Sequence, residues 1–245
     1  MKIVLRLAYN GKRYSGWQVQ NNAVTIQETL QDAILAVFGE RYPVTGCSRT
    51  DSGVHANDFC CSVNLPIETN IPEDKIPIAL NHHLPNDISV LSARYTDDNF
   101  HARYDVKYKE YEYLIWNSPI RNPFNDNLVY EYPKKLDENV MKNAAKLFIG
   151  KHDFASFMSS GSSVENTVRD IKYFNVIREN DIIKINVAAD GFLYNMVRIL
   201  VGTLIEVSEG KISEKDIPEI INSKDRKKAG FTAPPQGLYL NKVVY

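Results

Sequence analysis

The sequence predicts an α+β protein built of two halves, in each of which strands and helices alternate. Short apolar alternations typical of strands are separated by longer stripes with helical spacing. The 245 residues suit one large domain or two smaller ones, and they can bury a sizeable core. We place the boundary near residue 100, which gives an N-terminal half (1–100) and a C-terminal half (101–245).

The first half begins with a strand over residues 2–9, which is rich in β-branched and apolar residues, and Gly11 and Gly16 break the pattern that follows. Thr25 and Glu28 have the spacing of a capping box, so a helix is expected to start there. Its stripe is Ile26, Leu30, Ala33, Ile34 and Val37. The remaining elements are a strand over 59–65, a helix over 72–82 that opens with proline, and a strand over 88–95.

The second half repeats this style. It begins with a long strand, rich in aromatic residues, over 107–116. Asp137 can cap a helix that runs to residue 148, and Ser213 can cap a short helix that runs to residue 221. The other predicted elements are strands over 169–178 and 181–189 joined by a polar turn, a helical stripe over 193–204, and a closing strand over 238–245.

Composition excludes several classes of protein. No apolar run reaches eighteen residues, so no transmembrane helix is expected, and the N-terminus lacks a signal-peptide pattern. The three cysteines are odd in number and two are adjacent, which fits neither a disulfide framework nor a zinc site and indicates a reducing cytoplasm. The five histidines lack metal-ligand spacing, and no phosphate-binding glycine motif is present.

Net charge alone gives little information on nucleic-acid binding, because it is only −1. Positive residues nevertheless cluster at Lys107 and Lys109, and again within residues 224–228. Either cluster can be an ordinary solvated face.

Asp51 is the main candidate for chemistry. It lies between an arginine and a glycine in the short polar segment SRTDSGVHA, residues 48–56. A carboxylate placed in this way is ionised and open to a ligand, as a nucleophile or general base must be. The alternative is a simple turn, because Asp, Ser and Gly are the commonest turn residues.

Two further residues point to function. Tyr111 shares a strand face with Lys107 and Lys109, and a basic, aromatic face suits a phosphate backbone and a stacked base. The same face could instead pack tyrosines into a core. Arg198 lies inside an apolar helical stripe, where it requires either a carboxylate partner, such as Asp51, or a route to solvent.

Nine segments, in order along nearly the whole chain, resemble the TruA family of tRNA pseudouridine synthases. They are residues 7–20 (LAYNGKRYSGWQVQ), 25–30 (TIQETL), 48–56 (SRTDSGVHA), 80–88 (LNHHLPNDI), 100–103 (FHAR), 108–117 (YKEYEYLIWN), 150–157 (GKHDFASF), 191–204 (GFLYNMVRILVGTL) and 229–240 (AGFTAPPQGLYL). The resemblance implies the pseudouridine synthase fold, in which two α/β halves share a central, largely antiparallel sheet with the cleft between them.

The resemblance also implies roles for individual residues. Asp51 matches the catalytic aspartate, and Arg198 matches the arginine that pairs with it. Tyr111 matches the active-site tyrosine that packs on the target base, and Leu193 matches an apolar residue of the pocket. Arg49 matches a residue associated with opening the target nucleotide out of the stem. The chain departs from many bacterial members beside Asp51, because serine stands at position 52 where alanine is common.

The implied activity is isomerisation of uridine to pseudouridine on the 3′ side of the tRNA anticodon stem-loop, positions 38–40, by a cytoplasmic homodimer. No cofactor is expected, because the reaction needs neither redox change nor a group donor. One alternative is a catalytically inactive RNA-binding module, against which the presence of Asp51, Tyr111 and Arg198 argues. A carboxylate glycosidase is the other, but such enzymes use two acids, and no second acid is evident.

Overall fold

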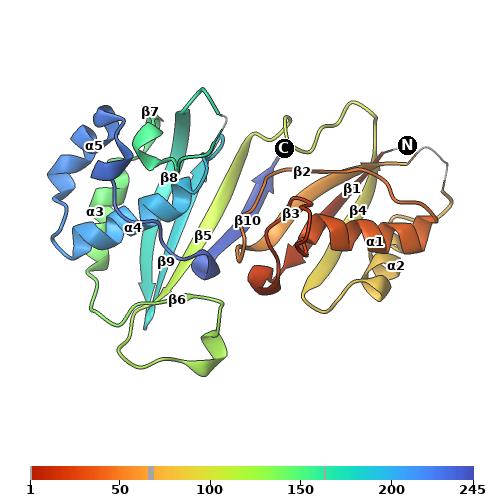
Figure 1. Cartoon of the computed structure of the whole chain (residues 1–245), viewed down its shortest axis with the longest axis horizontal. Helices are drawn as coiled ribbons and strands as arrows, with labels where there is room; N and C mark the ends of the chain where they lie inside the picture. The colour runs from red at the N-terminus through yellow and green to blue at the C-terminus, as the bar shows by residue number, and fades with distance from the viewer. Residues whose placement is uncertain (1, 66–68, 163) are drawn as a thin grey trace. The chain divides into compact units, whose positions relative to one another are not determined.

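The structure is a computed structural model that describes residues 2–65, 69–162 and 164–245 (Figure 1). The chain divides into two compact units. The first comprises Met1–Lys107 with Tyr239–Tyr245, and the second comprises Tyr108–Leu238. Each unit contains β-strands together with α-helices, and most of the strand pairs are antiparallel. The predicted α+β class is therefore confirmed.

The sheet of the first unit is centred on β1 (Lys2–Tyr9), which pairs antiparallel with β3 (His55–Asn64) and with β4 (Ile88–Thr96). Two more strands pair with β3: β2 (Val44–Gly46) in antiparallel fashion and β10 (Leu238–Val244) in parallel. A 3₁₀ helix, η1 (Gly11–Arg13), follows β1, while α1 (Ile26–Phe38) and α2 (Ile76–His83) pack against each other.

Aromatic packing dominates the core of the first unit. Trp17 stacks on Phe59 with a centroid distance of 4.0 Å, and both side chains are fully buried. Burial raises the pKa of the thiols of Cys60 and Cys61, so these cysteines pack as small apolar side chains.

In the second unit, β9 (Ile182–Ala189) lies between β5 (Tyr108–Trp116) and β8 (Val168–Glu179) and is antiparallel to both. The short strands β6 (Tyr130–Glu131) and β7 (Gly150–Asp153) extend this sheet through β5 and β8 respectively. Three helices gather on one side of it: α3 (Glu138–Lys146), α4 (Met196–Ser208) and α5 (Ile217–Ser223) (Figure 1). The short 3₁₀ helices are η2 (Pro123–Asn125), η3 (Ala155–Phe157), η4 (Glu214–Asp216), η5 (Arg226–Lys228) and η6 (Pro235–Gly237).

Most predicted elements are present, but two helices begin later than predicted. The helix expected from Pro72 starts at Ile76, because the carbonyl of Pro72 instead closes a turn with the N–H groups of Lys75 and Ile76. The helix expected from residue 193 starts at Met196, because Asn195 has a left-handed backbone (φ 60°). Strands β2, β6 and β7 were not predicted. They are only 3, 2 and 4 residues long, which is too short to show the alternation that identifies a strand.

None of the helices in the described part of the chain is long and apolar enough to cross a membrane.

Candidate active site

Asp51 lies in a tight turn between β2 and β3. The N–H of Val54 donates to the carbonyl of Asp51 at 3.1 Å, and Gly53 between them has a positive φ of 77°. Asp51 is half-buried in this turn. The turn interpretation of the sequence was therefore right for the backbone, and the turn presents a partly accessible carboxylate.

Residues 9–17 hold the Asp51 turn, in part through Thr50. The hydroxyl of buried Thr50 bonds that of Tyr9 at 2.8 Å, and the N–H of Trp17 donates to the carbonyl of Thr50 at 3.1 Å. Gly16, with φ 88°, makes this approach possible: a Cβ there would lie only 2.5 Å from the carbonyl oxygen of Thr50. Any larger residue at position 16 would push the turn away.

Tyr14, in the same segment, holds the turn through Ser52 and Gly53. Its carbonyl accepts the N–H of Gly53 and the hydroxyl of Ser52, each at 3.3 Å. Its own hydroxyl donates to Asp87 at 2.7 Å, and burial together with this carboxylate raises the pKa of Tyr14 to about 12. Tyr14 therefore stays a donor at neutral pH. The hydroxyl of Ser52, next to Asp51, thus helps to hold the loop.

His55, four residues beyond Asp51, anchors the loop to the sheet. It is buried, its Nδ1 accepts the N–H of Gly11 at 3.0 Å, and its ring stacks on Tyr239 at 4.6 Å. Gly11 is required at this point because a Cβ would lie 2.0 Å from the carbonyl of Val54. These contacts indicate a supporting role for His55.

The two basic candidates of the first unit, Arg49 and Lys107, differ in their contacts with the rest of the protein. Arg49 lies on the Asp51 loop with its side chain in solvent. Lys107 donates from its N–H to the carbonyl of Val244 at 2.8 Å and from Nζ to the main-chain oxygen of Tyr245 at 3.1 Å. Lys107 thus secures β10, and its ammonium group is also accessible to an anion.

The second unit holds the aromatic candidates. Tyr111 is 6% exposed, and the ring of Phe192 meets it edge-on with a centroid distance of 5.1 Å. Leu193 is buried next to Phe192, and its carbonyl accepts the N–H of Met196 at 3.0 Å. Lys109 precedes Tyr111 on the same face of β5, opposite Ala189 in β9, and is half-buried.

Arg198 lies in the first turn of α4 and is half-buried. Its Nε donates to the carbonyl of Ala233 at 2.6 Å, and its Nη1 donates to Oδ1 of Asn195 at 2.9 Å. Tyr113 lies nearby, fully buried, with its hydroxyl donating to the carbonyl of Pro234 at 2.7 Å. Burial raises the pKa of Tyr113 although the charge of Arg198 opposes that rise, so Tyr113 remains a neutral phenol.

The segment that carries Ala233 is itself packed closely on α4. A Cβ at Gly202 would lie 1.8 Å from the carbonyl of Phe231, and the N–H of Gly230 donates to the hydroxyl of Thr203 at 3.0 Å. Arg226 adds a bond from Nη1 to the carbonyl of Gly230 at 2.8 Å. These contacts fix the carbonyl that accepts from Arg198.

In the basic cluster at residues 224–228, two lysines form ion pairs with acidic side chains. Lys224 pairs with Asp153 at 2.7 Å, and Lys228 pairs with Glu219 at 3.0 Å. Both pairs are partly exposed, so they contribute little stability, but they offset the positive charge of this region.

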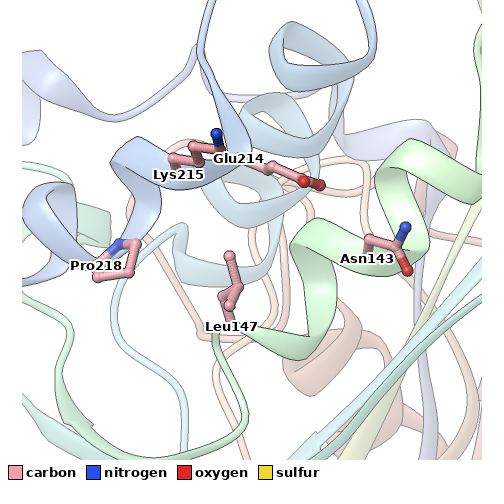
Figure 2. Close-up of a pocket in the computed structure, with 5 residues that line it drawn as sticks. All are labelled: Asn143, Leu147, Glu214, Lys215 and Pro218. Carbon is pink, nitrogen blue, oxygen red and sulfur yellow. The ribbon is translucent and has the colours of Figure 1, made fainter.

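Two other kinds of candidate site are a metal centre and a pocket. Within residues 2–65, 69–162 and 164–245, no group of three or more His, Cys, Asp or Glu side chains could hold a metal ion. A surface hollow of about 390 Å³ lies in the second unit beside α3, η4 and α5, and Figure 2 shows residues that line it. None of the predicted site residues lines it; its lining residues are Asn143, Leu147, Glu214, Lys215 and Pro218.

The structure places the predicted residues in two groups, one in each unit. Asp51, Arg49 and Lys107 belong to the first unit. The second unit holds Lys109, Tyr111, Leu193 and Arg198. Sequence reasoning missed the residues that hold these groups in place: Tyr9, Tyr14, Thr50, Asn195 and Ala233. No sequence signal singled out Asn195, because it lies within the apolar stripe that begins at Leu193.

Comparisons with known proteins identify the family of the chain. A family model described as tRNA pseudouridine synthase matches residues 7–105 and 144–245. Proteins named tRNA pseudouridine synthase A are 48% identical in Thermoanaerobacter pseudethanolicus, 47% in Acetivibrio thermocellus and 46% in Clostridium kluyveri, and in each case the match covers 99% of both chains. The chain therefore belongs to the tRNA pseudouridine synthase family, a family of isomerases.

Proposed function

We propose that this protein isomerises uridine to pseudouridine in tRNA, at uridines on the 3′ side of the anticodon stem-loop. The full-length similarity to enzymes named tRNA pseudouridine synthase A supports tRNA as the substrate class. The observation that carries the proposal is the setting of Asp51. It is the half-buried carboxylate of a turn braced by Tyr9, Trp17 and Tyr14, and the family resemblance implies that it is the catalytic aspartate.

The reaction conserves atoms and electrons. The bond from N1 of the base to C1′ of the ribose breaks, the uracil rotates, and a bond from C5 to C1′ forms. The proton on C5 is lost and N1 gains one. No electron acceptor or donated group enters, so a single ionised carboxylate can serve in the bond-breaking step.

The remaining residues are proposed to act as the resemblance implies. Arg198 is the cationic partner that favours the ionised carboxylate. Tyr111 and Leu193 replace the stacking that the base loses when it leaves the helix, which costs a few kcal/mol. In support, the ring of Tyr111 is already fixed by Phe192. Arg49 helps to open the target nucleotide out of the stem.

Lys107 and Lys109 are proposed to bind phosphates of the tRNA. We also propose that the protein acts as a homodimer in the cytoplasm. The family resemblance supports the dimer, and the three cysteines, which are buried free thiols, suit a reducing compartment. Measuring the mass in solution tests the dimer, and a fully active monomer would contradict it.

The test of the activity uses unmodified tRNA and the isolated anticodon stem-loop, with pseudouridine mapped at each position. The wild type should convert uridines on the 3′ side of the stem-loop, and Asp51→Asn should abolish conversion while tRNA affinity stays nearly intact. The substitution is isosteric and removes only nucleophilicity and basicity.

Two results would contradict the proposal. A turnover of Asp51→Asn within about tenfold of wild type would mean that the carboxylate contributes less than roughly 1.4 kcal/mol to the barrier. A wild type that binds tRNA without forming pseudouridine would instead support an inactive RNA-binding module.

A further inference from the structure

Asn195 precedes α4 in a backbone conformation that few residues adopt. Its φ of 60° and ψ of 8° are left-handed, whereas a residue at this position before a helix is ordinarily extended. Asparagine tolerates the left-handed region better than most residues with a side chain. The N–H of Ile199 donates to the carbonyl of Asn195 at 3.0 Å, and the N–H of Ser159 donates to the carbonyl of Tyr194 at 3.1 Å. The conformation is thus held from both sides.

The side chain of Asn195 is not used to cap the helix. Within the described first turn of α4 it accepts no backbone N–H. Instead its Oδ1 accepts from Nη1 of Arg198 at 2.9 Å, and its Nδ2 donates to the hydroxyl of Ser159 at 3.0 Å. Arginine can only donate, so the atom facing it must be the amide oxygen. The amide therefore links the segment at Ser159 to the guanidinium.

Two hydrogen bonds together define the direction of the guanidinium. The carbonyl of Ala233 accepts from Nε at 2.6 Å, and Asn195 accepts from Nη1. Because the group is rigid and planar, acceptors at two of its nitrogens fix its plane and the direction of its other N–H groups. Loss of the acceptor at Nη1 would remove one of these two constraints on the direction of the guanidinium.

We propose that Asn195 is a positioning residue for the isomerisation, which orients Arg198 through a neutral acceptor. The proposal rests on the proposed function, because it assigns Asn195 to the site through Arg198. An amide oxygen can orient the guanidinium and leave its positive charge intact. A carboxylate at the same place would keep the hydrogen bond but compete for the charge that the catalytic carboxylate needs.

The first variant is Asn195→Gly, which suits the left-handed backbone and removes only the amide. Its matched control is Asn180→Gly, at an exposed residue of the β8–β9 turn with nearly the same φ of 55°. The measurements are the single-turnover rate at saturating tRNA, the Kd for tRNA and the Tm. For Asn195→Gly the rate should fall by roughly 10²-fold, as expected for a misplaced catalytic group, while the Kd stays within about threefold. Asn180→Gly should leave both unchanged.

A second set of variants keeps the test independent of the fold at position 195. Asn195→Asp retains an acceptor and tolerates the backbone, so its stability should be close to that of the wild type, while its rate should fall because the acceptor is no longer neutral. Ser159→Ala removes the outer hydrogen bond and should lower the rate by a smaller factor. Ser159→Thr keeps the hydroxyl and should restore the rate.

The outcomes separate this inference from the proposed function. A wild type that forms no pseudouridine would refute the proposed function itself. An active wild type whose Asn195→Gly variant matches Asn180→Gly in rate would refute only the positioning role. If Asn195→Gly fails to fold, equal rates for Ser159→Ala and Ser159→Thr would refute that role as well. A rate loss with an unchanged Kd, restored by Ser159→Thr, supports it.

Discussion

Gly16→Ala is expected to damage activity more than stability, because Gly16 sets the distance between residues 9–17 and the Asp51 turn. A Cβ on Gly16 would lie 2.5 Å from the carbonyl oxygen of Thr50 and 3.1 Å from the carbonyl carbon of Asp51. Both neighbours are main-chain atoms, so no side chain can rotate away to make room. The Thr50 carbonyl also accepts the N–H of Trp17 at 3.1 Å, and that bond must stretch as the turn moves.

The size of the effect follows from this geometry. Reaching an ordinary separation of about 3.4 Å requires the carbonyl of Thr50 to move by about 0.9 Å. A displacement of about 1 Å in a catalytic group lowers rates by roughly 10²-fold, which is about 2.7 kcal/mol of barrier. The left-handed φ of 88° costs alanine about 1 kcal/mol, and the weakened hydrogen bond adds about 1 kcal/mol more.

Gly39→Ala is the matched control. Gly39 ends α1 with a similar φ of 80°, and no described atom outside its chain neighbours lies within 4 Å of its Cβ position. This variant should lose about 1 kcal/mol of unfolding free energy in urea and keep its full single-turnover rate on tRNA. If Gly16→Ala also kept its rate within about threefold, and lost no more stability than Gly39→Ala, the close approach would not position Asp51 and the reasoning would be wrong.

Three further predictions concern charge. Arg198→Met keeps much of the apolar volume and should lose most of the single-turnover rate; full activity would place Arg198 outside the site. Replacing Lys107 and Lys109 together with alanine should weaken tRNA binding and flatten its salt dependence by roughly one unit of slope for each phosphate that is no longer neutralised, whereas an unchanged slope would mean ordinary solvated lysines. Lys211 and neighbouring donors lower the pKa of Glu209 to about 2. That carboxylate therefore stabilises the fold above its unfolded pKa of about 4.3. Glu209→Gln should lower the free energy of unfolding by about 1 kcal/mol at pH 7, after allowance for solvent screening. In urea unfolding, this difference from the wild type should disappear as the pH falls from about 5 to 2.

Much of the fold could be predicted because its longer elements have clear periodicity. The stripe of α1, the run of β-branched and apolar residues in β1 and the turn between β8 and β9 are all visible in the sequence. The start of α4 was predicted at Leu193 because the apolar stripe includes that residue. The helix begins only at Met196, because the backbone of Asn195 is in the left-handed conformation. Periodicity records which residues are buried, and Leu193 is buried whether or not it is helical.

The candidate site shows where such reasoning ends. Local sequence could identify Asp51 as a carboxylate in a polar turn, because the turn residues are adjacent to it. It could not identify the groups that hold the turn, since the Tyr9 hydroxyl and the Tyr14 carbonyl are each about forty residues away along the chain. Both act through a hydroxyl or a backbone carbonyl, and neither group leaves a pattern in the sequence. The accuracy of the site therefore depends on long-range hydrogen bonds and on close approaches at Gly11 and Gly16, which only three-dimensional structure reveals.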